Sequence, residues 1–292
     1  MPEATKVSIE TSIKEPDIVF YDVRKAPFVV YGLYDYQNQS VFRRLPENIA
    51  AETSAGVKQL ALETAGGRLR FSTDSEYIAI SVKMPYIKRL SHMPMTGTTG
   101  FDLYLDSDGG SRYVKTFKPD ANIKGGYESL IRVGGRGMRS YTINFPSYNA
   151  VNELYIGVSA KSHIGAGKEY RTKLPVVFYG NSITQGACSS RPGLTYENMI
   201  SRKYDLDYIN LGFSGNGRAE LPIVNYMASL DMLAFVSDYD HNAPSVDFLR
   251  DTHQRMYEII RAAQPDIPYL MISRCDFHGG EDDFLRRDVV ID

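Results

Sequence analysis

The chain has 292 residues, of which 43% are hydrophobic and 23% are charged, and its formal net charge is -2. The near balance of basic and acidic residues excludes the clustered positive charge that is typical of nucleic-acid binders. No stretch approaches the roughly 20 apolar residues that a membrane span needs, so membrane insertion is not expected. A chain of this length buries a sizeable core and fits two domains better than one.

The start of the chain, MPEATKVSIETSIKEPD, lacks the basic segment and apolar core of a secretory signal. We therefore expect a cytoplasmic protein, or a secreted or periplasmic one if a signal peptide has been removed. The two cysteines, Cys188 and Cys275, form no disulfide framework and lack the spacing of metal ligands. Neither a metal nor a cofactor is expected.

Short strands separated by Gly, Asp, Pro, Ser or Asn are predicted from about residue 17 to residue 170. In chain order they are DIVFYDV, RLRFST, YIAISVKM, FDLYLDS, YVKTFK, ESLIRV, SYTINF and ELYIGVSA. Several of them alternate, so that Ile78, Ile80 and Val82 point to the same side of their strand. Alternation is expected where one face of an antiparallel sheet meets a core, and residues 1–170 are therefore predicted to form a β-sandwich domain.

The pattern changes at the polar stretch GAGKEYRTK, near residues 165 to 173. The apolar runs LPVVFYG, YINLGFS, MLAFVSDYD and YLMISR then alternate with longer segments of helical spacing. One such helix is predicted from Ser245, its N-cap, to Gln264. Its apolar face comprises Val246, Leu249, Met256, Ile260 and Ala263. Alternating strands and helices predict a doubly wound parallel sheet in residues 171–292.

Three of these predicted strands end at residues that could carry chemistry. Ser182 follows the first strand, Gly215 follows the second, and Asn242 follows the third. Sites in open parallel sheets form beyond the carboxyl ends of the strands, so we expect the three to converge. Ser182 could attack an acyl carbon, and the N–H groups of Ser182 and Gly215 and the Asn242 side-chain amide could bind the oxyanion that develops. In the alternative interpretation all three are ordinary turn or helix-start residues.

The blocks GNSITQG, NLGFSGNG and DYDHNAP, in this order, resemble those of the SGNH, or GDSL-like, hydrolases. Upstream, TTGFDLYLD resembles the Gly-x-Asp-Leu-Tyr motif of a β-rich domain that precedes the hydrolase in one branch of the family. The resemblance covers the chain from roughly residue 20 to its end, and the usual Gly-Asp-Ser is replaced here by Gly180-Asn181-Ser182.

The resemblance implies that Ser182 is the nucleophile and that Gly215 and Asn242 are oxyanion donors. It also implies a three-layer α/β/α sandwich of the flavodoxin-like type, preceded by the β-sandwich. The function implied is that of a serine esterase without metal or cofactor, which hydrolyses small acyl esters such as acetyl groups on carbohydrates. A glycan-binding protein with an inactive hydrolase-like domain is the alternative.

Members of this family complete the site with an Asp-x-x-His block after a fifth strand, and the sequence stops before such a block. The last residues, GGEDDFLRRDVVID, are predicted to form a helix that ends on apolar residues, so we expect the chain to be a fragment whose open sheet edge favours association. Asp238 and His241 have the Asp-x-x-His spacing but lie in the third block. In an extended strand these two side chains would point to opposite faces, and His241 is more simply a residue that holds the Asn242 loop.

Five other residues receive predictions. His253 should pack on the apolar face of its helix, and His278 should lie in a surface loop. Cys188 is expected to be a buried thiol rather than a rival nucleophile. Arg191 and Arg218 follow two strand ends, where they either hold a carboxylate or phosphate of a substrate or are solvated loop residues.

Overall fold

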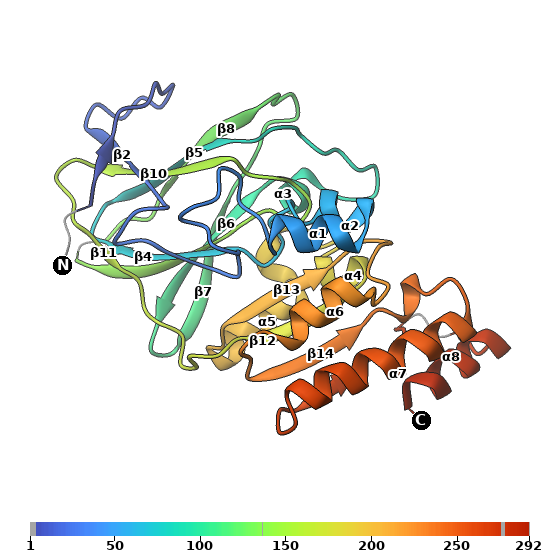
Figure 1. The fold of residues 1–292 in the computed structure, drawn as a ribbon. Helices are drawn as coiled ribbons and strands as arrows, with labels where there is room; N and C mark the ends of the chain where they lie inside the picture. The colour runs from blue at the N-terminus through green and yellow to red at the C-terminus, as the bar shows by residue number, and fades with distance from the viewer. Residues whose placement is uncertain (1–3, 136, 276–277, 292) are drawn as a thin grey trace.

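The computed structural model describes residues 4–135, 137–275 and 278–291, and three β-sheets organise them (Figure 1). The first is antiparallel, in the order β1 (Lys6–Val7), β2 (Ile18–Asp22), β10 (Glu153–Ser159), β5 (Tyr77–Lys83) and β8 (Gly126–Arg132). The second is also antiparallel, in the order β11 (Ile164–Ala166), β4 (Arg68–Thr73), β9 (Arg139–Asn144), β6 (Phe101–Ser107) and β7 (Gly110–Phe117), and β3 (Val29–Tyr31) pairs with β4. The predicted antiparallel β-rich region is therefore present.

One hydrophobic core joins these two antiparallel sheets. Ile78, Ile80 and Val82 of β5 belong to it, as the alternation in the sequence predicts. Phe71 of β4 and Ile143 of β9 enter the same core from the second sheet. The apolar positions of the two sheets therefore face one another, and each strand needs apolar residues only at every second position.

The third sheet is parallel and has the order β13 (Tyr208–Gly212), β12 (Val176–Gly180), β14 (Ala234–Asp238) and β15 (Tyr269–Met271). The prediction of a parallel sheet is confirmed. The register pairs Gly180, the last residue of β12, with Gly212 of β13 and Asp238 of β14. The carboxyl ends of three neighbouring strands are therefore level.

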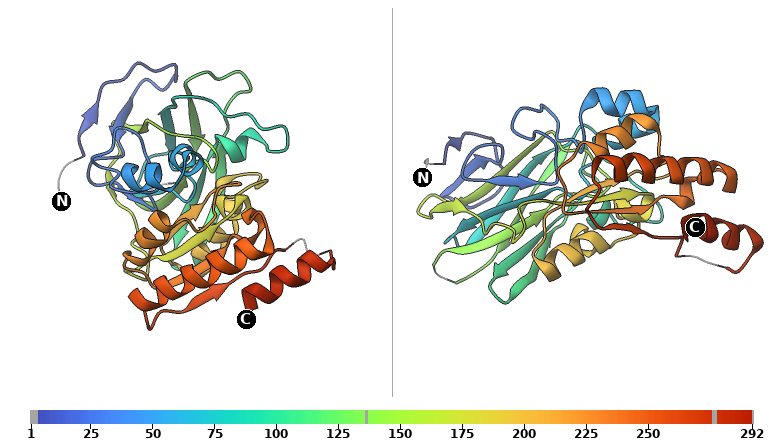
Figure 2. Two further views of the ribbon diagram at one scale, coloured as in Figure 1. Left: turned by 45° about the vertical axis from the view of Figure 1, so that its right-hand side comes forward. Right: turned by 60° about the horizontal axis from the view of Figure 1, so that its bottom comes forward.

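Helices cover both faces of the parallel sheet. They are α4 (Ser182–Gln185), α5 (Tyr196–Tyr204), α6 (Leu221–Ala228), α7 (Val246–Ala263) and α8 (Glu281–Ile291). Val177 and Tyr179 of β12 share a core with α6 and α7, whereas Phe178 packs with Tyr196 of α5 on the other face. The right-hand view of Figure 2 shows α5 and α7 on opposite sides of the sheet.

Helix α7 begins as predicted, because the Ser245 hydroxyl accepts a hydrogen bond from the Phe248 N–H at 3.1 Å. Leu249, Met256 and Ile260 are buried, in agreement with the predicted apolar face. Val246 is half-buried, whereas Ala263 is exposed, so the predicted face is wrong at Ala263. Thr252 and His253 are also buried, and His253 was predicted on this face.

Three short helices lie in the region that the sequence suggested to be strands alone. They are α1 (Glu47–Thr53), α2 (Ala55–Leu60) and α3 (Met95–Thr98). Helices α1 and α2 pack against the parallel sheet: Ala50, Val57 and Leu60 share a core with Leu211 of β13 and Ile223 of α6. The N-terminal half therefore contributes directly to the core beneath the carboxyl end of β13.

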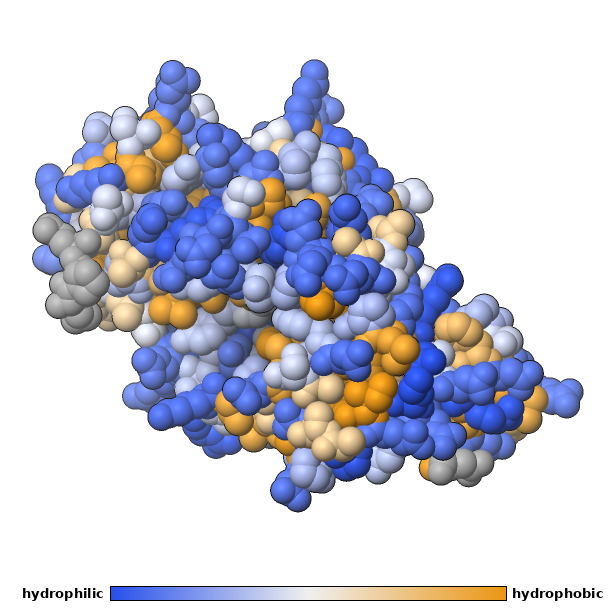
Figure 3. Space-filling model, viewed as in Figure 1, coloured by the Kyte–Doolittle hydropathy of each residue, from blue (hydrophilic) through white to orange (hydrophobic). Residues whose placement is uncertain are grey.

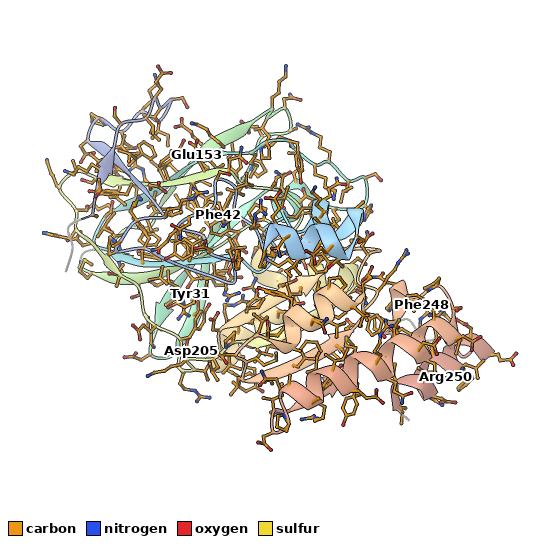
Figure 4. The ribbon with its side chains drawn as sticks, viewed as in Figure 1. Tyr31, Phe42, Glu153, Asp205, Phe248 and Arg250 are labelled. Carbon is orange, nitrogen blue, oxygen red and sulfur yellow. The ribbon has the colours of Figure 1, made fainter. Side chains whose placement is uncertain are left out.

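Buried arginines also tie the antiparallel region to the parallel sheet. The Arg68 guanidinium lies 2.5 Å from an Asp207 carboxylate oxygen, and Arg70 lies 3.3 Å from Asp205. Figure 4 labels Asp205 at this junction. Because Arg68 is only 1% exposed, its ion pair is protected from solvent screening and fixes the two regions relative to each other.

Hydrophilic side chains cover much of the face seen in Figure 3, and a hydrophobic patch lies over α6, where Leu221 is 45% exposed. Helix α7 has 18 residues, and no helix in the described part of the chain combines the length and apolar character required of a membrane span.

Candidate active site

Two hydrogen bonds connect the three sequence blocks at the carboxyl edge of the parallel sheet. The Phe213 N–H donates to the Gly180 carbonyl at 2.9 Å, which joins the second block to the first. The Asn242 side-chain amide donates to the Phe213 carbonyl at 3.1 Å, which joins the third block to the second. The structure therefore brings together the strand ends that carry Ser182, Gly215 and Asn242.

Ser182 is the first residue of α4, and Asn181 before it is the N-cap. The Asn181 side-chain oxygen accepts a hydrogen bond from the Ile183 N–H at 2.6 Å. Its side-chain nitrogen donates to the backbone carbonyl of Asp238 at 2.8 Å and to the Asp238 carboxylate at 3.2 Å. Asn181 is fully buried, so these contacts fix the backbone that presents Ser182, which is itself only half-buried.

The close approach of α4 to the sheet requires glycine at the strand ends. A β-carbon at Gly180 would lie 2.2 Å from the Thr184 hydroxyl oxygen and 2.4 Å from the Asp238 carbonyl oxygen. A β-carbon at Gly212 would lie 2.3 Å from the Gln185 nitrogen. All three separations are shorter than a real β-carbon allows, so larger residues at either position would push the Ser182 turn away from the sheet.

The N–H groups of Ser182 and Gly215 have no protein acceptor among the residues that the structure describes. Gly215 is exposed and has a positive φ of 69°. The Asn242 side-chain amide carries two N–H hydrogens, and in the described structure one of them is donated to the Phe213 carbonyl. Donors without a partner at adjacent strand ends are the arrangement that an oxyanion requires.

Tyr148, from the loop before β10, reaches this site from the antiparallel region. Its hydroxyl donates to the Ser182 backbone carbonyl at 3.0 Å. Burial raises the pKa of Tyr148 to about 12, so the hydroxyl remains a donor well above neutral pH. Tyr148 could not be predicted from the sequence, because nothing in the PSYNA segment marks a contact with a serine 34 positions later.

The strand geometry that was expected to separate Asp238 from His241 is absent. β14 ends at Asp238, and residues Asp240–Asn242 form a turn of 3₁₀ helix. Burial, and to a smaller extent the neighbouring Asp240, raise the pKa of Asp238 to about 6, although an electrostatic interaction with His241 lowers it. Asp238 and His241 therefore interact, although the Asp238 carboxylate also binds the Asn181 amide and the Thr184 hydroxyl.

Cys188 is exposed rather than buried, so that expectation is wrong. It lies in the turn that follows α4, where its backbone has a positive φ of 62°. His278 is exposed, as predicted. His253 is buried and stacks on Tyr239, with ring centroids 5.9 Å apart, so the predicted packing role is correct.

The two loop arginines differ from each other. Arg191 packs over the Tyr113 ring, and its Nε lies 3.5 Å from the buried Asp102 carboxylate of the FDLY motif. It is therefore already paired with a protein carboxylate. Arg218 is exposed and fits the solvated alternative. Among the described residues, no cluster of three or more His, Cys, Asp or Glu side chains could hold a metal ion.

Two family models match the chain. The GxDLY model, described as the N-terminus of Esterase_SGNH_hydro-type, matches residues 18–164. The Lipase_GDSL_3 model, described as the GDSL-like Lipase/Acylhydrolase family, matches residues 173–287. Among proteins with curated descriptions, none matches this chain.

Solved structures with the same fold include a Bacteroides ovatus protein described as a GDSL-like lipase. It is 26% identical, with a TM-score of 0.85 over 94% of this chain and 81% of that chain. A salicylyl-acyltransferase from a tetracycline biosynthetic pathway is 17% identical, with a TM-score of 0.74 over 95% of this chain and 81% of that chain. A family two carbohydrate esterase from Cellvibrio japonicus is 10% identical, with a TM-score of 0.59 over 94% and 83%. The last two show a shared fold.

Proposed function

Because the chain belongs to the SGNH-hydrolase type of esterases, in the branch with an N-terminal GxDLY domain, we propose that it is a serine acylhydrolase of small acyl esters. In this proposal the Ser182 hydroxyl oxygen attacks the ester carbonyl carbon and the alcohol leaves. Water then hydrolyses the acyl-enzyme and releases the acid. The proposed chemistry uses neither a metal nor a cofactor.

The observation that carries this proposal is the pair of N–H groups without a protein acceptor, on Ser182 and Gly215, at adjacent strand ends of the described structure. In the proposed mechanism they bind the oxyanion, with the free N–H of the Asn242 amide as the third donor. These donors are neutral and fixed by the backbone or by the Phe213 carbonyl, so they need little reorganisation as charge develops on the substrate.

The fold that we propose for this function is a three-layer α/β/α sandwich in residues 171–292, preceded by a β-sandwich in residues 1–170. The helices on both faces of the parallel sheet support the first part. The core shared by the two antiparallel sheets supports the second.

We further propose acylated carbohydrates as the substrate class, with acetyl as the acyl group. The proposal draws on the carbohydrate esterase from Cellvibrio japonicus, whose fold extends over both regions of this chain. The half-buried position of Ser182 in a site lined by polar groups also suits a polar ester better than a long acyl chain.

The test is hydrolysis of p-nitrophenyl acetate by the chain as it stands, by Ser182→Ala and by Ser190→Ala. Ser190 is an exposed serine of the segment that follows α4 and serves as the matched control. We expect Ser182→Ala to lower kcat at least about 100-fold and Ser190→Ala to leave it unchanged. A fluorophosphonate probe should form a phosphonate ester with the Ser182 oxygen alone, with loss of fluoride.

A third variant, His241→Gln, tests whether the histidine beside Asn242 accepts the Ser182 proton. A loss of kcat as large as that of Ser182→Ala would identify His241 as the base. The proposed acylhydrolase activity would be contradicted by equal rates for the wild-type chain and Ser182→Ala together with no labelling by the probe. That result would favour the glycan-binding alternative, which binding to a glycan array would then test.

A further inference from the structure

A line of buried polar side chains runs from the antiparallel region to the loop that carries Gly215. The Gln185 side-chain oxygen accepts a hydrogen bond from the Ser214 N–H at 2.9 Å. Its nitrogen donates to a Glu63 carboxylate oxygen at 2.5 Å and, more weakly, to the Ser147 carbonyl at 3.3 Å. The other Glu63 oxygen accepts from the Lys88 ammonium at 2.6 Å. Gln185 and Glu63 are both fully buried.

Gln185 connects the two elements whose relative position decides whether an oxyanion can be bound. It lies on α4, three residues after Ser182, and its partner Ser214 directly precedes Gly215. Because the Ser214 N–H is held by Gln185, the position of Ser214 relative to Ser182 is set, and this constrains the next peptide group, whose N–H belongs to Gly215.

Glu63 determines which way the Gln185 amide faces. An amide has a donor end and an acceptor end of nearly equal shape, whereas an ionised carboxylate only accepts hydrogen bonds. Facing Glu63, the amide must present its nitrogen there and its oxygen to Ser214. The Lys88 ammonium offsets the cost of burying this carboxylate.

We infer that Gln185 and Glu63 are positioning residues of the oxyanion site, through which the GxDLY domain holds the Gly215 N–H toward the nucleophile. The inference rests on the proposed function and deepens it: the N-terminal domain then supplies part of the catalytic geometry. Neither residue touches the substrate. Both act through the Ser214–Gly215 peptide.

The test exchanges the two side chains. In Gln185→Glu two carboxylates face each other, and in Glu63→Gln two amides compete for one orientation. In the double variant, Glu63→Gln with Gln185→Glu, the amide at position 63 again donates to position 185, whose other oxygen again accepts from Ser214. We expect each single variant to lower kcat for p-nitrophenyl acetate at least about 10-fold with KM unchanged, and the double variant to return within about 3-fold of wild type.

Two surface variants control for the chemical change itself. Gln59→Glu and Glu52→Gln alter the same side-chain types at exposed positions of α2 and α1, and both should behave as wild type. Thermal unfolding identifies any variant that fails to fold. If one single variant fails to fold, the double variant can still be compared with the wild type.

A second readout is independent of turnover. Hydrogen exchange at the Ser214 amide should be slow in the wild type and the double variant, and at least about 10-fold faster in the two single variants. Ser182-dependent hydrolysis that is unaffected by both single variants would overturn the inference and leave the proposed function standing. A chain without esterase activity contradicts the proposed function, and equal protection of Ser214 in all four proteins would then overturn the inference as well.

Discussion

Replacing Arg44 by methionine should destabilise the protein by about 3 to 5 kcal/mol. Arg44 is 1% exposed and donates to three backbone carbonyls, those of Asn210 at 3.2 Å, Gly212 at 2.6 Å and Leu60 at 2.7 Å. Its guanidinium also lies over the Phe213 ring at 4.4 Å. The side chain therefore joins α2 to the strand end that precedes the Gly215 loop.

The magnitude follows from the acceptors that methionine would leave without a donor. A hydrogen bond from a charged group contributes about 1.5 to 3 kcal/mol, so three of them amount to about 4.5 to 9 kcal/mol. Burial opposes this, since desolvation lowers the pKa of Arg44 to about 10, and methionine removes that penalty while filling similar volume. The net loss of about 3 to 5 kcal/mol is still a large part of the roughly 5 to 15 kcal/mol that stabilises a typical domain.

Urea unfolding measures this free energy, and Arg43→Met provides the control. Arg43 is the preceding residue, and its ion pair with Glu47, at 3.1 Å, involves a glutamate that is 68% exposed. Such surface pairs contribute at most about 1 kcal/mol. Equal midpoints and slopes for Arg44→Met and Arg43→Met would refute the reasoning, because the buried bonds would then contribute no more than the exposed one.

Two further predictions concern pH. Burial lowers the pKa of His253, so the contribution of the neutral side chain to stability is complete above about pH 6.5 and is lost as the pH falls toward the folded-state pKa. As the pH falls from 7 to 5, the melting temperature of His253→Phe should therefore rise relative to that of the wild type. A difference in melting temperature that stays constant over this range would contradict the prediction. Burial raises the pKa of Asp102 to about 6 from 3.8, so its contribution is complete below pH 3.8 and is lost as the pH rises through 6. Between pH 4 and pH 7 the free energy of unfolding of the wild type should therefore fall by up to about 3 kcal/mol relative to that of Asp102→Asn, as measured by urea unfolding. A difference between the two proteins that does not change with pH would contradict the raised pKa of Asp102.

Strands with a strong local pattern could be predicted from the sequence almost to the residue. The segments RLRFST and FDLYLDS have the bounds of β4 and β6. Helices α1 and α2 could not be predicted in this way, because they have only seven and six residues. Their apolar positions face the core of the parallel sheet, which is distant in sequence, rather than the core of the antiparallel sheets. Period and length are local properties, whereas the choice of core is not.

The same distinction applies to the candidate site. The convergence of Ser182, Gly215 and Asn242 could be predicted from the sequence, because parallel strands place their carboxyl ends at one edge of a sheet. The contact between Gln185 and Glu63 spans 122 residues and joins two regions of different architecture. A sequence pattern marks Gln185 as part of a block but gives no sign of its partner, so the role of Gln185 follows only from its contacts in the structure.

Asn181 shows how the structure interprets a departure from a family motif. The resemblance leads one to expect aspartate at this position, and asparagine retains the oxygen that caps α4. Its nitrogen adds what aspartate lacks, a donor to the Asp238 carboxylate at 3.2 Å. Aspartate at both positions would set two carboxylates against each other beside Ser182, where burial already raises the pKa of Asp238 to about 6. Asparagine at position 181 therefore keeps the Ser182 turn anchored to β14 and retains the N-cap of α4.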